Sequence, residues 1–375
     1  MSKEELFHSL RKSYLSLLLV HPNSNDSKDV ENHLWMQTSY AFISLYKQRI
    51  SALDRDIQNN QRQQQQDHGQ AHKQSSSHYN AVEHRKLIQR FKQFLADEER
   101  FWSQLVLRLL RLFDLQEARP ALAALGLLGE VDEAVPSTSA NPDGASVPQG
   151  GATLGSNGRN HFQFPPEDPS VTYLPATAEE RETRLSTLSK ALICLGDIAR
   201  YREQYNESNG RPRAGHDDAI PARRGRRRGG GPEAVARPRN YDKAMQCYEQ
   251  ARSLVPNEGN PSHQLAILAS YQNDSFSSIV HYYRSLCVRQ PYDTAAENLG
   301  TVLAKALDAW RQKMKREKEM NGANDVTLAP RIRISLFTEK IVVLHALWRI
   351  GMEKGTEKYG AVSLLFQSSN LCGLG

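Results

Sequence analysis

Apolar residues recur every three or four positions along most of the chain, a spacing that predicts amphipathic α-helices. We expect one helix over residues 29–57, capped by Asp26 or Ser27, and another over residues 82–118, with Pro120 marking a boundary after it. The first has an apolar face made of Val30, Leu34, Ala41, Leu45 and Ala52, which is broadened by Trp35, Phe42, Tyr46 and Leu53. The apolar face of the second helix contains Leu87, Phe91, Phe94, Leu95, Phe101, Trp102, Leu105, Leu109 and Leu112. No strand-length alternation of apolar and polar residues occurs, so the sequence predicts an all-α fold.

Three segments lack this periodicity. Residues 58–80 are rich in glutamine, residues 129–180 in Pro, Gly, Ser and Ala, and residues 206–239 in Arg and Gly. Such compositions bury too little apolar surface to offset the entropy of ordering the chain. We therefore predict long disordered insertions between helices that resume near Leu185 and Tyr241.

Small and aromatic residues on both sides of the third segment have the spacing of a tetratricopeptide repeat, a recurring pair of antiparallel helices. The Leu195-Gly196 pair supplies the signature of the first helix, so the arginine-rich segment is an insertion within one repeat. The second helix carries the small and aromatic residues at intervals of four, three and five positions: Ala244, Tyr248, Ala251 and Pro256.

A second repeat follows within residues 262–291, and another helix comes after it. Its first helix contains Leu265, Ala266 and Ala269; its second contains Ser278, Tyr282 and Ser285. We expect one helical domain over residues 1–310. Residues 311–375 are expected to start a second helical region, and the sequence leaves open whether that region is truncated.

Composition excludes several classes of protein. The cysteines stand far apart without a CxxC motif, which disfavours a zinc site and a disulfide framework. The longest apolar runs fall well short of a membrane span. The N-terminus lacks a signal-peptide pattern and is typical of a first helix with a Ser2–Glu5 capping box. We expect a protein of the nucleus and cytoplasm that uses no membrane, metal or cofactor.

The formal net charge of +6 comes from one segment. Residues 211–239 hold nine arginines and three acids, so the remainder of the chain is neutral overall. Such a tract can bind RNA or single-stranded DNA, serve as a nuclear import signal, or be a solvated loop. Its lack of aromatic residues weakens the version based on base stacking. The densest candidates are Arg223, Arg224, Arg226, Arg227 and Arg228.

Arg200 and Tyr201 fall off the apolar stripe of the helix that is expected from Leu185. Asp197 stands three residues before Arg200, where an ion pair can form. One interpretation is a solvated salt bridge, contributing about 0–1 kcal/mol. The other is an anion clamp, in which Asp197 orients Arg200 and the Tyr201 hydroxyl adds a donor. A clamp needs a second cation from another helix, and Lys47, also off its predicted stripe, is the candidate.

Two stretches, LGDIARYR at residues 195–202 and the whole of residues 241–299, resemble the Est1-like family. This family comprises the telomerase-associated Est1 protein and the Smg-type factors of nonsense-mediated mRNA decay. Weaker similarity extends over residues 34–54, 91–110 and 333–350. A departure occurs at residues 262–263, where Ser-His stands in place of the usual Tyr-Asn.

The resemblance implies a 14-3-3-like array of antiparallel helices whose groove binds phosphoserine peptides. In the family, a Lys on an early helix and the Arg of a Gly-Asp-x-x-Arg-Tyr motif hold the phosphate. Gly196, Asp197, Arg200 and Tyr201 match that motif, and the Lys maps onto Lys47. On this interpretation, Arg200→Glu abolishes phosphopeptide binding and leaves the helical circular-dichroism signal intact.

Catalytic signatures are missing from the sequence. It has no Walker loop, GxSxG or HExxH motif, and no aspartate of a nuclease domain follows residue 350. We therefore expect an adaptor and not an enzyme, whose partner would by resemblance be a phosphorylated helicase of the decay pathway. The alternative is a telomerase-associated subunit that binds RNA or single-stranded DNA through residues 211–239.

Overall fold

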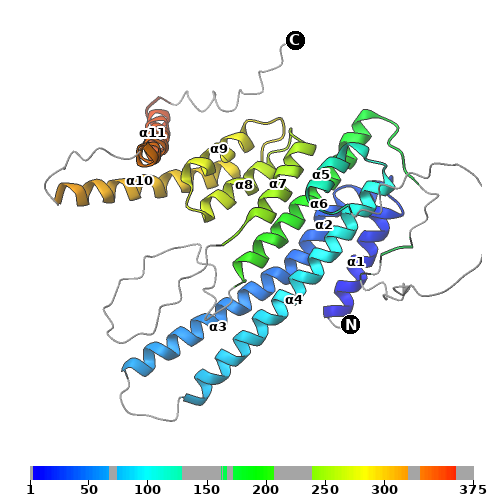
Figure 1. The fold of residues 1–375 in the computed structure, drawn as a ribbon, viewed down its shortest axis with the longest axis horizontal. Helices are drawn as coiled ribbons and strands as arrows, with labels where there is room; N and C mark the ends of the chain where they lie inside the picture. Colours follow the sequence, from blue (N-terminus) through cyan, green and yellow to red (C-terminus); the bar gives the residue numbers. More distant parts are fainter. Residues whose placement is uncertain are drawn as a thin grey trace, which may run out of the picture. The chain divides into compact units, whose positions relative to one another are not determined.

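The described residues are helical and contain no β-strand, which confirms the all-α class (Figure 1). The computed structural model describes residues 3–66, 74–128, 162, 164–166, 172–206, 239–319 and 330–359. The chain divides into two compact units, Met1–Val255 and Pro256–Gly375. The described residues leave out most of the predicted insertions. The parts left out include residues 67–73, 129–161 and 207–238.

The first unit is built on the long helices α3 and α4, against which α6 and α7 are layered. Helix α4 packs against both α3 and α6, and α6 packs against α7 (Figure 1). Phe91, Phe101 and Trp102 of α4 are fully buried in this core. The helices are α1 (Lys3–Leu19), α2 (Val30–Leu34), α3 (Tyr40–Gln66), α4 (Gln74–Leu112), α5 (Arg119–Ala124), α6 (Ala178–Gln204) and α7 (Asp242–Leu254).

A π-helical turn at Trp35–Ser39 changes the register of the first predicted helix. A π turn holds about one residue more than an α turn, so it rotates every later side chain by about 100°. The predicted face is therefore only partly right after the turn: Ala41, Leu45 and Ala52 are exposed, whereas Phe42 stacks on Phe94 and Tyr46 on Phe91. The residues of α3 that enter the core are Ile43, Ile50 and Ile57.

The boundaries of α4 also differ from the prediction. The helix ends at Leu112, because Asp114 adopts a left-handed φ of 47° and the Leu115 N–H bonds back to the Leu110 carbonyl. Pro120 begins a helix and does not end one, since it lies in the first turn of α5, where its missing N–H costs nothing.

Part of the expected linker before α6 is ordered. Phe164 is buried and stacks on Phe101 with ring centroids 5.2 Å apart. Helix α6 begins at Ala178, because Thr177 accepts a hydrogen bond from the Glu180 N–H and Glu180 accepts one from the Ala176 N–H. Thr177 thus caps the first turn of α6, and Glu180 holds the residue that precedes this cap. Helices also extend into the glutamine-rich segment, as α3 reaches residue 66 and α4 starts at residue 74.

Helices α6 and α7 pack as the predicted tetratricopeptide pair. Ala244, Tyr248 and Ala251 of α7 are buried, and α7 meets α6 at Gly196. A Cβ atom at residue 196 would lie 2.5 Å from Cε1 of Tyr248 and 3.1 Å from Cβ of Cys247. Glycine is therefore required by the close approach of the two helices.

Gly196→Ala is expected to destabilise the protein by about 2 kcal/mol, because overpacking outweighs the helix propensity of alanine, which is worth about 1 kcal/mol. The fully buried Tyr248 ring cannot move aside, since its hydroxyl bonds Asp197 and Arg200. Thermal unfolding measures the effect. Gly351→Ala in α11 is the control, because nothing lies within 4 Å of its added Cβ and it should not destabilise. An unchanged midpoint for Gly196→Ala would contradict the packing argument.

The second unit contains the second predicted repeat and two long helices. Its helices are α8 (Asn260–Tyr271), α9 (Ser275–Leu286), α10 (Ala295–Glu319) and α11 (Pro330–Tyr359). Ser278 donates to the Ala266 carbonyl at 3.0 Å and Ser285 to the Gly259 carbonyl at 2.8 Å, so the small residues bring α8 and α9 together. Helix α10, assigned from the sequence to the first domain, packs against α9 and α11.

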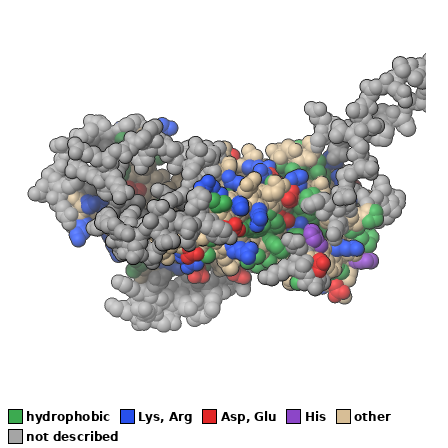
Figure 2. All heavy atoms as spheres, turned by 90° about the horizontal axis from the view of Figure 1, so that it is seen from below, with side chains coloured by type: hydrophobic (Ala, Val, Ile, Leu, Met, Phe, Trp, Pro, Cys, Tyr) green, Lys and Arg blue, Asp and Glu red, His purple; other side chains and the backbone are tan. Residues whose placement is uncertain are grey.

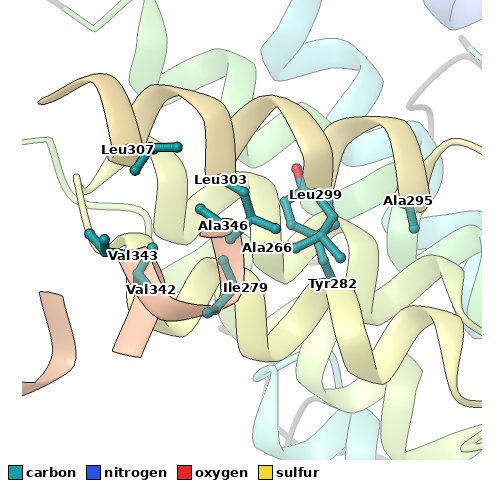
Figure 3. Packing of buried hydrophobic residues seen from close by; sticks show 10 residues of the cluster. All are labelled: Ala266, Ile279, Tyr282, Ala295, Leu299, Leu303, Leu307, Val342, Val343 and Ala346. Carbon is teal, nitrogen blue, oxygen red and sulfur yellow. The ribbon is translucent and has the colours of Figure 1, made fainter. Parts of the chain in front are cut away.

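One apolar cluster joins the helices of the second unit (Figure 3). Leu299, Leu303 and Leu307 of α10 recur every four residues and point toward α9 and α11. Val342, Val343 and Ala346 supply the face of α11 that closes the cluster. This packing shows that the similarity noted over residues 333–350 falls on a folded helix.

Candidate functional site

The aromatic ring of Tyr201 brings together the two cations that the sequence predicts for an anion clamp. The Lys47 ammonium lies 5.2 Å from the centroid of the Tyr201 ring, and the Arg200 guanidinium carbon lies 4.7 Å from it. Lys47 comes from α3 and Arg200 from α6, so the arrangement exists only in the folded first unit. Both contacts are within the range of cation–π attraction.

Arg200 is fixed by a buried hydrogen-bonded triad. Its Nη2 donates to Oδ1 of Asp197 at 2.8 Å, and its Nε donates to the Tyr248 hydroxyl oxygen at 3.3 Å. The Tyr248 hydroxyl in turn donates to the same oxygen of Asp197 at 2.5 Å. Burial, together with the Asp197 carboxylate, raises the pKa of the Tyr248 phenol well above its ordinary value, so the hydroxyl keeps the proton that it donates.

The interpretation of a solvated surface salt bridge is wrong for Asp197 and Arg200. Their side chains are 12% and 9% exposed, and every residue of α6 from Thr187 to Tyr201 except Lys190 is buried. The helical wheel misses this because α6 is covered by α4 on one side and α7 on another, so its polar face meets protein. A buried pair of this kind costs desolvation energy that good geometry and further hydrogen bonds must offset.

Lys47 reaches Tyr201 because of the π turn. In the observed register Lys47 lies four residues after Ile43 and three before Ile50, the two positions of α3 that are fully buried. Its side chain therefore starts on the inward side of α3 and is half-buried. The sequence predicts Lys47 off the apolar stripe, and the register after the π turn corrects this.

A pocket of about 360 Å³ opens beside Lys47 along α3. Besides Lys47, hydroxyl, amide and guanidinium groups line it: Tyr40, Ser44, Gln48, Ser51 and Arg55. Sequence reasoning missed these residues. Ser44, Ser51 and Arg55 stand three, four and eight positions from Lys47, a helical spacing that is a signal for one polar face.

Models of two protein families match the chain on either side of the arginine-rich segment. The model described as telomerase activating protein Est1 matches residues 29–206, and the one described as Est1 DNA/RNA binding domain matches residues 244–359. Between them they take in the Lys47–Arg200 site and the whole second repeat. The chain belongs to the Est1-like family.

Curated relatives of this Est1-like chain match a limited region. The nonsense-mediated mRNA decay factor SMG7 of Arabidopsis thaliana is 38% identical over 120 residues, which are 32% of this chain and 9% of that protein. The telomerase-binding protein EST1A of Danio rerio is 32% identical over 122 residues, which are 32% of this chain and 6% of that protein. The aligned part of the chain thus spans less than a tenth of either relative.

A solved structure supports the fold of the Est1-like chain. It is described as the crystal structure of Est1 and Cdc13, and it superposes with a TM-score of 0.51 at 12% sequence identity. The match covers 91% of this chain and 49% of the solved one. At this identity the likeness concerns the fold, a helical array, and carries no residue role.

The arginine cluster and the Ser262-His263 pair noted in the sequence are not part of the Lys47–Arg200 site. Arg223, Arg224, Arg226, Arg227 and Arg228 lie outside the described residues. The described ends of their segment are held together, because the Asn240 N–H donates to the Glu203 carboxylate at 2.8 Å. Ser262 and His263 are buried in the second unit, where Nε2 of His263 lies 2.8 Å from the Asn298 amide.

On the face shown in Figure 2, Lys and Arg side chains are interspersed with acidic and hydrophobic ones. This agrees with the overall neutrality of the chain outside residues 211–239. Among the described residues, every helix is too short or too polar to cross a membrane.

Proposed function

We propose that the first unit binds phosphoserine peptides through Lys47, Arg200 and Tyr201. The observation that carries the proposal is that two cations from separate helices contact one tyrosine ring beside a polar pocket. A phosphoserine carries close to two negative charges and three acceptor oxygens, which suit two converging cations and a hydroxyl donor.

Preorganisation supports the same proposal. Asp197 and Tyr248 hold the Arg200 guanidinium, so a phosphate would not have to order that side chain on binding. The guanidinium is mostly buried, and the half-buried Lys47 supplies the second charge. Charge-assisted hydrogen bonds gain strength in such a partly desolvated site.

A peptide titration tests the proposal directly. Fluorescence anisotropy would compare a labelled phosphoserine peptide with its unphosphorylated twin on the full chain. We expect binding of the phosphopeptide only, weakening as salt is raised, because the interaction is between partly exposed charges. Equal affinity for both peptides would exclude the clamp.

An adaptor role in nonsense-mediated mRNA decay follows from this binding activity as our proposal, with a phosphorylated helicase of that pathway as partner. Its support is the similarity to the decay factor SMG7 together with the geometry of the site. Pull-down from cell extract, with and without phosphatase treatment, tests it. The partner should be captured only from the untreated extract.

Nucleic-acid binding is the second candidate, in line with a telomerase-associated role. A specific observation favours it: residues 244–359 match a family model described as a DNA/RNA binding domain. The arginine excess of residues 211–239 directly precedes that region and supplies the positive charge that the rest of the chain lacks.

Deletion of residues 211–239 is expected to remove salt-dependent RNA binding and to leave phosphopeptide binding unchanged. If about six phosphates are neutralised on a single strand, affinity falls roughly 300-fold between 50 and 200 mM salt. Filter binding of a single-stranded RNA measures the RNA affinity and its salt dependence, and the anisotropy titration measures phosphopeptide binding. If the deletion variant keeps the affinity and the salt slope of the intact chain, the arginine-rich segment is not the binding element.

A further inference from the structure

The polar pocket along α3 contains a second cation that the phosphate site does not use. Lys47 and Arg55 both line it, with Ser51 between them and Ser44 beyond Lys47. None of the pocket-lining residues is acidic. The pocket therefore presents positive charge at two points and neutral hydrogen-bonding groups at the others.

The two cations are separated by a distance that an extended peptide can span. Eight residues of α-helix rise about 12 Å. An extended chain advances about 3.3 Å per residue, so 12 Å corresponds to about four residues. A second anionic group about four residues from a phosphoserine held at Lys47 would thus face Arg55.

Arg55 is available for such a contact. Its side chain is exposed, and its Nε donates to the Ser51 carbonyl at 3.3 Å, which directs the guanidinium along the helix surface. Among the described residues no carboxylate pairs with Arg55. The nearby Asp54 pairs with His84, its Oδ1 lying 2.7 Å from Nε2 of the imidazole.

We propose that Arg55 forms a second anion subsite, which selects peptides with two phosphoserines, or a phosphoserine and an acidic residue, about four positions apart. The proposal rests on the proposed phosphopeptide function and names the substrate class that the same groove prefers. Arg55 would act as a specificity-determining residue, and Lys47 and Arg200 would hold the first phosphate.

The test uses the full chain and three synthetic peptides in an anisotropy titration. One carries a single phosphoserine, and two carry a further phosphoserine four residues before or after it. We expect one of the doubly phosphorylated peptides to bind about 5- to 10-fold more tightly than the single one, and the preference to shrink at high salt. Arg55→Gln should abolish this preference and leave the affinity for the single phosphopeptide unchanged.

Arg49→Gln is the matched control, because Arg49 is exposed on the same helix and does not line the pocket. It should leave all three affinities unchanged. If wild type shows no preference for either doubly phosphorylated peptide, or if Arg55→Gln keeps the preference, the second subsite is refuted while the phosphopeptide function stands. If the single phosphopeptide fails to bind wild type, both proposals fall.

Discussion

Lys47→Glu is expected to reduce phosphopeptide affinity roughly 10- to 100-fold, because it removes a charge-assisted hydrogen bond worth about 1.5–3 kcal/mol and adds repulsion. Its effect on stability should be small. Lys47 is half-buried and loses a cation–π contact with Tyr201, which is worth about 0.5–1 kcal/mol. Anisotropy titration and thermal unfolding of the same preparation separate the two effects.

Lys12→Glu is the control for the change in net charge. Lys12 is exposed on α1, outside the pocket of α3, so its reversal should leave phosphopeptide affinity within about twofold of wild type after salt screening. Equal losses for the two variants would mean that bulk charge, and not the Lys47 site, attracts the peptide.

Arg200→Glu is a poorer test than we expected from the sequence. Arg200 faces Asp197 in a buried setting, so the substitution would place two carboxylates together there. Loss of binding by this variant would then reflect unfolding as readily as loss of the clamp. The half-buried Lys47 avoids that confusion.

Much of the fold was predictable because it depends on local patterns. The Leu-Gly pair and the spacing of small and aromatic residues predict the α6–α7 contact, and the close approach at Gly196 confirms the pairing. The all-α class follows from helical periodicity alone. Helix ends were missed where the left-handed conformation of Asp114 or the N-cap Thr177 decided them.

The candidate site was only partly predictable, for two physical reasons. Burial of Arg200 depends on α4 and α7 covering α6 from both sides, which no single-helix wheel contains. The inward position of Lys47 depends on the π turn at Trp35–Ser39, which apolar spacing does not reveal. The pocket residues of α3 all follow this turn, so their shared face is present in the sequence spacing and was overlooked.

Asp197→Ala is expected to lower the free energy of unfolding by about 3 kcal/mol, because it leaves Arg200 as a buried charge without its carboxylate. It also removes the acceptor of the Tyr248 hydroxyl. For a unit of this size the unfolding midpoint should fall by roughly 6–12 °C. Thermal denaturation followed by circular dichroism measures the shift.

Tyr248→Phe and the double variant show whether the triad acts as one unit. Removal of the hydroxyl alone should cost about 1 kcal/mol. Since Asp197, Arg200 and Tyr248 share one network, the double variant should be less destabilised than the sum of the single variants. Additive effects would show that the hydroxyl and the carboxylate stabilise Arg200 independently. An unchanged unfolding midpoint for Asp197→Ala would show that Asp197 does not stabilise the buried Arg200. The proposed role of Asp197 in orienting Arg200 would then be excluded.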